Sequence, residues 1–521
     1  MRGSRLLALG AVVATGAAAP AASAAVGPLS QASSLSPFPA ACNGAPQNGT
    51  EFRNTEVEPY VDLDPTQPSA LIGVYQQDRY ETGGANGIGT SISADGGGTW
   101  TQLPPAALPK FTRCAGAAPG SVGDYERATD PWVTYGADGR AYQMSLSFND
   151  TRNLASAMLV STSDDDGATW SDPKALIVDT NPHVFNDKNS ITADPHIAGN
   201  VYAVWDRLVF PNERAGGVSY LTAAAFRGPA YFTRTTDAGA TWEPARPIFD
   251  PGQNDQTIGN QIAVTGTGDL VNVMTVFRND NGAGRKGGTV SVLRSTDQGA
   301  SWSGEIVVDR LGTVGVTDPR DGAEVRTGDI IPSIATDERP GHDEVYAVWQ
   351  DARWTGFQRD QIAFSKSTDG GLTWSSPVRI NGDESTQAFT AAIKVDDSGN
   401  IAVTYYDFRN DTVASPSLDT DVWVLRSSDG GASWSEERVT PSSFDMRQAP
   451  FASGFFVGDY EGLTATGETF KPLFSMSDPA TDTFSTTVAA PFPEATIVPE
   501  PAPAGLIARD FPVQRGKPTP R

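Results

Sequence analysis

Arginine and aspartate residues recur together along this chain, directly after short apolar runs. A guanidinium can hold a carboxylate through two parallel hydrogen bonds, so a group of arginines around one opening could bind an acidic ligand. The simpler interpretation is that each pair is a salt bridge that holds neighbouring structural units in register. The pairs are Asp78-Arg79, Asp206-Arg207, Arg278-Asn279, Asp351-Ala-Arg353 and Asp407-Phe-Arg409.

Two other segments combine a tyrosine with carboxylates, which can act as a nucleophile and as general acids or bases. The tetrapeptide Gly-Asp-Tyr-Glu occurs at 123–126 and again at 458–461. Neighbouring residues of a strand point to opposite faces, so Tyr460 and Glu461 cannot pair directly if both lie in a strand. The candidate catalytic residues are Asp124, Glu126, Asp130, Tyr460 and Glu461.

The elements that must position these residues are marked by an eight-residue pattern, S-x-D-x-G-x-[TS]-W, in which Thr replaces the first Ser once. Its six copies span 93–100, 163–170, 235–242, 295–302, 367–374 and 427–434. Asp and Ser or Thr side chains can bond turn amides, and Gly tolerates a positive φ. Each copy therefore predicts a tight turn between two strands. We interpret the repeated aspartates as turn formers and not as catalytic groups.

Runs typical of β-strands surround each turn, and a long-period repeat of four such runs predicts blades of a β-propeller. A further unit without the pattern follows the last turn, at about 455–488. The expected fold is an all-β propeller of four-stranded antiparallel blades, with seven blades favoured and six as the alternative. The N-terminal segment could supply the missing outer strand of the last blade. The arginine pairs and the tyrosine segments are expected on the face opposite the repeated turns.

Four regions are expected along the chain. Residues 1–24 carry two arginines, an apolar run and Ala22-Ser23-Ala24, which is typical of a secretory signal peptide. Residues 25–50 are an irregular or capping segment, and 51–490 form the propeller. Residues 491–521 hold eight prolines in 31 positions and predict a disordered tail. The mature protein is therefore expected to be secreted, with no membrane span.

The formal net charge of the chain is −24. So acidic a protein is a poor partner for nucleic acid or anionic membranes. The two cysteines, Cys42 and Cys114, both lie early in the exported chain and are expected to form one disulfide. The three histidines show no metal-ligand spacing and are interpreted as surface or turn residues. We expect no metal and no cofactor.

The six turn patterns, the predicted propeller and the arginine-rich face resemble the sialidase superfamily, whose repeat is known as the Asp-box. The resemblance covers residues 51–490. It implies three arginines that bind a substrate carboxylate, a tyrosine nucleophile activated by a glutamate, and an aspartate acid/base. Tyr460 would be the nucleophile with Glu126 or Glu461, and Asp130 or Asp124 the acid/base. Arg79, Arg353 and Arg409 would form the triad, with Arg207 and Arg278 as further candidates. The family's Arg-Ile-Pro motif is replaced here by Phe52-Arg53-Asn54-Thr55.

Three functions are compatible with these residues. The leading one is a glycoside hydrolase of the sialidase type that releases sialic acid, or a related acidic sugar, from extracellular glycans. A second is a glycosidase that uses two rim carboxylates on a neutral polysaccharide. A third is a propeller that binds glycan or protein without catalysis. The other rim carboxylates are Asp78, Asp206, Asp351 and Asp407.

Overall fold

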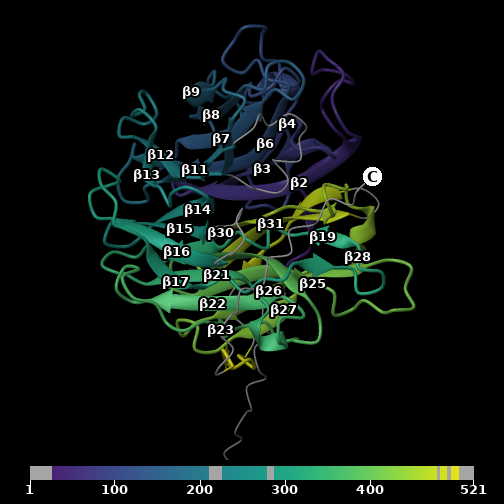
Figure 1. Ribbon diagram of the computed structural model, residues 1–521, viewed down its shortest axis with the longest axis vertical. Coiled ribbons are helices and arrows are strands. Elements are labelled where there is room, and N and C mark those ends of the chain that lie inside the picture. The colour runs from purple at the N-terminus through teal and green to yellow at the C-terminus, as the bar shows by residue number, and fades with distance from the viewer. Residues whose placement is uncertain (1–25, 211–225, 279–286, 478–480, 490–493, 504–521) are drawn as a thin grey trace, which may run out of the picture.

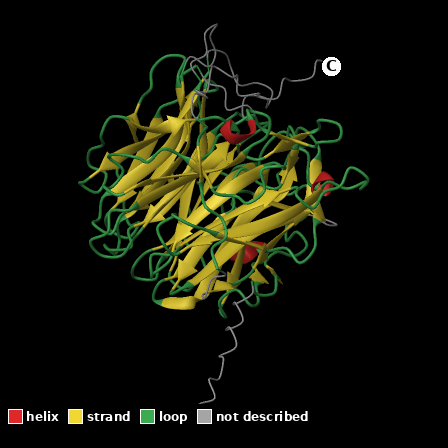
Figure 2. Cartoon of the chain, turned by 90° about the horizontal axis from the view of Figure 1, so that it is seen from below, coloured by secondary structure: helices red, strands yellow, loops and turns green. Residues whose placement is uncertain are grey.

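The computed structural model describes residues 26–210, 226–278, 287–477, 481–489 and 494–503. The expected signal peptide, 1–24, lies outside these residues. The described chain is almost entirely β, and its helical segments are short 3-10 turns (Figure 2). They are η1 (Pro105–Ala107), η2 (Arg353–Thr355) and η3 (Met446–Gln448). No helix in the described part of the chain is long and apolar enough to cross a membrane.

The strands are grouped into antiparallel units of four, in the order of the sequence, as the repeat predicts. A pairing of Ala85 with Ala128 joins the first two units into one sheet, and three later units carry a fifth strand. The first unit contains β2 (Glu51–Asp64), β3 (Gln67–Tyr80), β4 (Ala85–Ser93) and β5 (Thr101–Gln102). The second contains β6 (Arg127–Tyr135), β7 (Ala141–Phe148), β8 (Ser156–Ser163) and β9 (Lys174–Asp179). The third contains β10 (Val184–Ala193), β11 (Val201–Val209), β12 (Ala230–Thr235) and β13 (Arg246–Phe249).

The next three units follow the same plan. The fourth contains β14 (Gln256–Val264), β15 (Leu270–Phe277), β16 (Gly288–Ser295) and β17 (Ile306–Arg310). The fifth contains β20 (Ser333–Thr336), β21 (Val345–Asp351), β22 (Gln361–Ser367) and β23 (Val378–Arg379). The sixth contains β24 (Ala388–Val395), β25 (Ile401–Asp407), β26 (Asp419–Ser427) and β27 (Ser435–Arg438), and β28 (Phe444–Asp445) also pairs with β26.

The last unit joins the two ends of the described chain. Its strands β30 (Gly462–Thr466), β31 (Thr469–Ser477) and β32 (Thr481–Ser485) pair in order, β33 (Val488–Ala489) also pairs with β31, and β1 (Ser30–Gln31) completes the sheet beside β32. The first strand of each unit contacts the first strand of the next, and β30 contacts β2. In Figure 1 the yellow C-terminal strands accordingly lie beside the purple strand β2.

The six repeated turns lie between the third and fourth strands of their units and have one hydrogen-bond pattern. In the first copy the Ser93 hydroxyl bonds the Asp95 carboxylate at 2.9 Å and accepts the Gly97 amide at 2.9 Å. Thr99 donates its amide to the same carboxylate at 2.9 Å. Gly97 has φ +88°, a conformation that favours glycine. These aspartates therefore have the geometry of turn formers.

A β-bulge interrupts the first strand of five units at the same place. The pairing with the second strand shifts register at Glu58, Asp130, Lys188, Gly259 and Thr390. Each of these residues has a positive φ, between 46° and 73°. For residues other than glycine this conformation costs about 1–3 kcal/mol, and it re-aims the side chain.

The N-terminal segment is mostly irregular, as expected, and a disulfide joins Cys42 to Cys114. The expectation of a disordered tail over 491–521 is wrong for residues 494–503. There β34 (Glu500–Pro501) pairs with β23, and Ile497 forms a bridge with Trp434. The prolines tolerate this arrangement because β34 is an edge strand, where an amide donor can be spared. The rest of the tail lies outside the described residues.

Candidate functional site

Two bulges and the segment before β30 bring three carboxylates onto one ammonium group, which itself lies at a third bulge. Lys188 Nζ lies 2.9 Å from Glu58 Oε1, 3.2 Å from Asp130 Oδ1 and 2.7 Å from Asp459 Oδ2. Glu58, Asp130 and Lys188 are the bulge residues of consecutive first strands, β2, β6 and β10. All four side chains are nearly buried, with at most 11% of each exposed. We call these four residues the central charge cluster.

Two arginines flank this cluster. Strand β19 (Glu324–Arg326) pairs with β18 (Val316–Thr317) and lies parallel to β29 (Phe455–Phe456), which brings Arg326 to Asp459. Arg326 donates to both oxygens of Asp459, and the Nε bond is 2.9 Å. Arg326 and Arg79 both lie over the Phe456 ring, 4.5 and 5.1 Å from its centroid. The site therefore contains three cations beside its carboxylates.

Burial and these neighbouring charges shift the pKa values of the carboxyl groups in opposite directions. Burial raises the pKa of Glu58 to about 7, against the lowering effect of the Lys188 ammonium. Burial also opposes ionisation of Asp459, but Arg326 and Lys188 hold its pKa well below the usual range. Burial raises the pKa of Asp187, beside Lys188, to about 6. A protonated and an ionised carboxyl group can thus coexist near neutral pH, which acid–base catalysis requires.

A small cavity of about 30 Å³ opens beside the cluster. Its lining includes Glu58, Asp130, Lys188, Arg79, Arg326 and Asp187, with Phe148 and Phe185 as an apolar wall. Three polar atoms of these lining residues are buried and have no hydrogen-bond partner within the described structure: Arg79 Nε, Arg326 Nη1 and Asp187 Oδ2. Unpaired buried donors and acceptors are costly, and their presence at one cavity indicates a polar ligand.

Aromatic rings from β2, β6 and the segment before β30 pack together next to the cluster. Tyr60 stacks on Trp132 with ring centroids 3.7 Å apart, and Trp132 lies 5.1 Å from Tyr460. The Tyr460 hydroxyl donates to the Pro131 carbonyl oxygen at 3.1 Å. Burial raises the pKa of Tyr460 well above its usual value, so the phenol is neutral at physiological pH.

The expected partners of Tyr460 lie elsewhere. Glu126 accepts the amides of Asp150 and Thr151 at 2.9 Å each. Glu461 is buried beside the hydroxyls of Thr404 and Tyr406, and burial raises its pKa to about 8. Tyr460 and Glu461 thus have different neighbours; both precede β30, so the alternation of a regular strand does not apply to them.

Asp124 has a structural environment in the loop that precedes β6. It pairs with Arg113 at 2.6 Å and with Arg152 at 3.3 Å. The Gly120 amide also donates to it at 2.8 Å. Asp130 alone among the predicted catalytic residues belongs to the central charge cluster.

The three arginines of the predicted triad do not share one pocket. Arg79 lines the cavity beside the cluster. Arg353 pairs with Asp351 at 2.7 Å and with Asp309 at 3.3 Å. Arg409 donates to Asp407 and to Glu436, at 2.5 and 2.6 Å.

The remaining predicted arginines pair with carboxylates around the rim. Arg207 pairs with Asp179 across two units, and Arg278 pairs with Asp255 and Glu305. Apart from Arg79, the arginine pairs are thus ion pairs within or between units. That was the simpler interpretation of the pattern.

Asp78 and Asp206 are buried hydrogen-bond acceptors. Asp78 accepts the Asn54 amide at 2.8 Å and the Ser36 hydroxyl at 2.6 Å. Asp206 accepts the Thr257 hydroxyl at 2.6 Å and the Gly259 amide at 2.9 Å, which connects the third unit to the fourth. Burial nevertheless raises the pKa of Asp206 to about 7.

The predicted catalytic and binding residues did not include Glu58, Asp187, Lys188, Arg326 or Asp459. A signal for the first was present, because Glu58-Pro-Tyr60 and Asp130-Pro-Trp132 occupy the same place in successive first strands. Aligning the first strands would have placed Glu58 beside Asp130. Lys188 carries no such motif, and only the shared bulge brings it into the cluster.

A larger cavity, about 480 Å³, is lined by the C-terminal ends of the first strands and by the turns that join first and second strands. Its charged lining includes Lys394, which pairs with Glu338 at 2.8 Å, and Asp62. Asp62 is already held by the Tyr135 amide and the Thr464 hydroxyl, both at 2.9 Å. Despite its smaller cavity, the central charge cluster is the better candidate for chemistry because it combines shared carboxylates with unpaired polar atoms.

No protein-family model and no curated protein matches this sequence. Among solved structures, the Hadza microbial sialidase Hz136 is 16% identical with a TM-score of 0.44, over 70% of this chain and 66% of that one. A Penicillium chrysogenum α-L-arabinanase is 11% identical with a TM-score of 0.42, over 87% and 97%. A PL25 ulvan lyase is 13% identical with a TM-score of 0.42, over 75% and 80%.

Proposed function

We propose that this chain is an exported glycoside hydrolase with a seven-bladed propeller fold, and that its chemistry takes place at the central charge cluster. The observation that carries the proposal is the convergence of three buried carboxylates on Lys188 beside a cavity with unpaired polar atoms. Buried, perturbed carboxylates next to a cavity are typical of catalytic sites. The substrate would be an extracellular glycan, in keeping with the signal-like segment 1–24.

Glu58 and Asp130 are the proposed catalytic pair. Protonated Glu58 would donate its proton to the glycosidic oxygen as the bond to the anomeric carbon breaks. Asp130 would attack that carbon, and Glu58 would then deprotonate the water that releases the sugar. Their oxygens lie 2.9 and 3.2 Å from one nitrogen, so they are at most about 6 Å apart. Glycosidases that retain configuration have carboxyl groups about 5–5.5 Å apart.

Two arginines favour a second candidate, an acidic sugar as substrate. Arg79 Nε and Arg326 Nη1 are the unpaired donors at the cavity, and such donors suit a carboxylate. The sialidase-type mechanism would further require an activated Tyr460, whose hydroxyl bonds a backbone carbonyl here. We therefore favour the carboxylate pair and keep Tyr460 as the alternative nucleophile.

Hydrolysis of fluorogenic neutral and acidic glycosides by residues 25–521 tests both candidates. Glu58→Gln and Asp130→Asn should each lower kcat/KM by at least about 100-fold, the range of general acid–base catalysis. Tyr460→Phe should stay within a few-fold of wild type. Wild-type activity should fall as pH rises through about 7, because Glu58 must be protonated to act as the acid.

Asp407→Asn is the matched control, because burial raises the pKa of Asp407 to about 7 outside the cluster. It should keep wild-type activity. Loss of turnover in Tyr460→Phe with full activity in Glu58→Gln would instead support the sialidase-type mechanism. Glycan binding without turnover on any substrate would support a non-catalytic propeller.

A further inference from the structure

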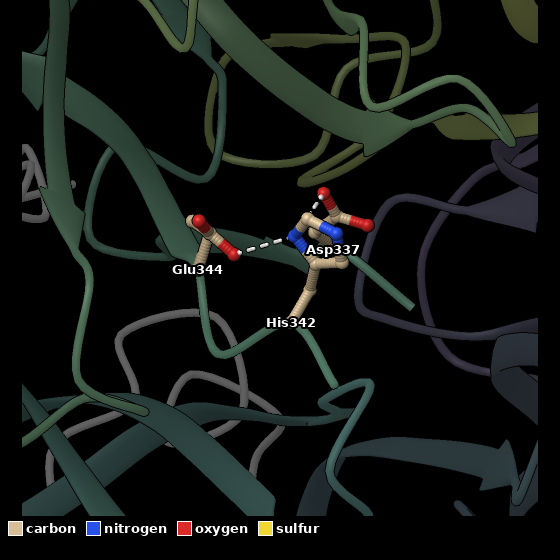
Figure 3. A group of neighbouring side chains, drawn as sticks. All are labelled: Asp337, His342 and Glu344. Carbon is tan, nitrogen blue, oxygen red and sulfur yellow. Dashed lines mark hydrogen bonds and ion pairs between the residues drawn. The ribbon is translucent and has the colours of Figure 1, made fainter. Parts of the chain in front are cut away.

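The turn between β20 and β21 places an imidazole between two carboxylates, far from the residues of the central charge cluster in the sequence. His342 Nδ1 lies 3.1 Å from Glu344 Oε2 and 3.3 Å from Asp337 Oδ2. One nitrogen and two carboxylate oxygens, one from each residue, lie within 4.8 Å of one another. The three side chains converge on one point in Figure 3. Asp337 is buried, whereas His342 and Glu344 are partly exposed, so solvent can reach the group.

The backbone of this turn is fixed by four hydrogen bonds. The Asp337 amide donates to the Glu344 carbonyl and the His342 amide to the Arg339 carbonyl, both at 3.0 Å. Gly266, in the neighbouring fourth unit, donates to the Asp337 carbonyl at 3.1 Å and accepts the Gly341 amide at 3.0 Å. The three side chains thus start from fixed backbone positions, which lowers the cost of gathering them around a ligand.

Arg339 holds Asp337 in place. Its Nε donates to Asp337 Oδ1 at 2.8 Å, and its Nη2 donates to Oδ2 at 2.5 Å. Arg339 Nε also donates to Oδ2 in a longer bond of 3.1 Å, so a metal ion on Oδ2 would take the place of this bond. Carboxylates that bind metals are commonly oriented by such outer hydrogen bonds.

The equivalent turn of the third unit shows what is particular to this group. There Asp194 stands in the place of Asp337, and His196 follows it. The Tyr202 hydroxyl donates to Asp194 Oδ2 at 2.8 Å, and His196 Nε2 lies 3.0 Å from the Thr265 carbonyl oxygen. In that turn the His196 amide donates to Asp194 Oδ1 at 2.9 Å, but the imidazole ring lies against a different partner. In the fifth unit the aspartate and the imidazole both face the same point, together with Glu344.

We propose that Asp337, His342 and Glu344 bind a divalent transition metal ion, with Zn²⁺ as the best match. One imidazole nitrogen and two carboxylate oxygens are a donor set that Zn²⁺ accepts, whereas Ca²⁺ and Mg²⁺ prefer oxygen alone. Glu344 adds a second carboxylate beside Asp337, whose own charge Arg339 already partly neutralises. The ion would displace any proton on His342 Nδ1, and water would complete the coordination on the exposed side.

Zinc titration of residues 25–521, prepared without a polyhistidine tag, tests this proposal. The chain has three histidines, so the imidazole nitrogen signals of a ¹⁵N-labelled sample can be followed separately by NMR. Zn²⁺ should shift the His342 signals, saturate at one ion per chain and leave His183 and His196 unchanged. Ca²⁺ and Mg²⁺ should leave all three unchanged.

Calorimetry of matched variants supplies the control. His342→Ala should abolish the one-site binding, and Glu344→Gln should weaken it at least about tenfold through loss of a charged ligand. His196→Ala, in the equivalent turn, should bind zinc as wild type does. Equal zinc binding by His342→Ala and wild type, or His342 signals that do not move in excess zinc, would overturn the assignment.

Discussion

At the scale of residues, Lys188 is the group on which the central charge cluster depends. Three buried carboxylates share its ammonium, and Arg326 supports one of them, Asp459. Taking charges out of water is expensive, and the cost is offset only while each charge has its partner. The positive φ of Lys188, Glu58 and Asp130 adds backbone strain at the same place. Backbone strain and buried charge that occur together are typical of functional sites.

Lys188→Met should destabilise the protein by about 3–5 kcal/mol at pH 8.5, the usual cost of breaking a buried ion pair. The loss should be smaller at pH 6. Burial already raises the pKa of Glu58 to about 7, and without the ammonium its pKa rises further. The variant can then take up a proton below that pKa, and this relief is lost as pH rises through it. Urea unfolding at the two pH values measures the difference.

Lys110→Met is the control for this prediction, because Lys110 pairs with Asp172 at an exposed site. It should change the free energy of unfolding by no more than about 0.5 kcal/mol. A pH-independent loss in Lys188→Met would mean that packing, and not charge, is what Lys188 contributes.

At the scale of elements, the strands and their turns could be predicted because their signals are local. Alternating apolar residues and the S-x-D-x-G-x-[TS]-W pattern predict each hairpin. The site could be predicted only in part. Asp130 and Arg79 reach it, whereas Arg353 and Arg409 do not. Recurrence at a strand end does not show whether a side chain points to the centre of the molecule or to the rim.

The bulges explain why Glu58 and Lys188 were missed. A bulge shifts the side-chain alternation by a residue, and sequence periodicity does not reveal it. The ordered part of the tail was missed for another reason. Residues 494–503 are rich in proline, and their position depends on pairing with the edge of β23 and on the bridge between Ile497 and Trp434. These partners lie far away in the sequence.

Truncation before residue 494 tests the role of this packed tail. It removes β34 from the edge of β23, and it removes the Glu500 carbonyl that accepts the Trp354 indole N–H at 3.0 Å. Trp434, fully buried in the described structure, also loses its contact with Ile497. The melting temperature should fall by about 4 °C, as expected for a loss near 2 kcal/mol in a large protein. Tryptophan emission should shift to the red. Truncation after residue 503 keeps these contacts, and an equal fall in that chain would contradict the prediction.

At the scale of the whole molecule, stability depends on the contact between the two ends of the described chain. Each unit packs on its neighbours, and the last unit takes its outer strand, β1, from the N-terminal segment. Ala32, next to β1, donates its amide to Thr483 at 2.8 Å and is buried with Val61 and Leu473. The Ser91 hydroxyl also donates to the Ala32 carbonyl at 2.6 Å, so the segment joins the first and last units through hydrogen bonds and a small apolar contact.

Ala32→Asp should open this closure, because it places a carboxylate among apolar side chains. We expect a loss of about 3 kcal/mol in the free energy of unfolding. Amide exchange should become faster in β2 and β30 as well as in β32, since the first strands of the first and last units contact each other. Leu35→Asp introduces the same residue at a position that is 78% exposed, and it should change neither quantity. Faster exchange confined to β1 and β32 would show that the N-terminal strand only covers an edge, and that the contact between the first and last units holds without it.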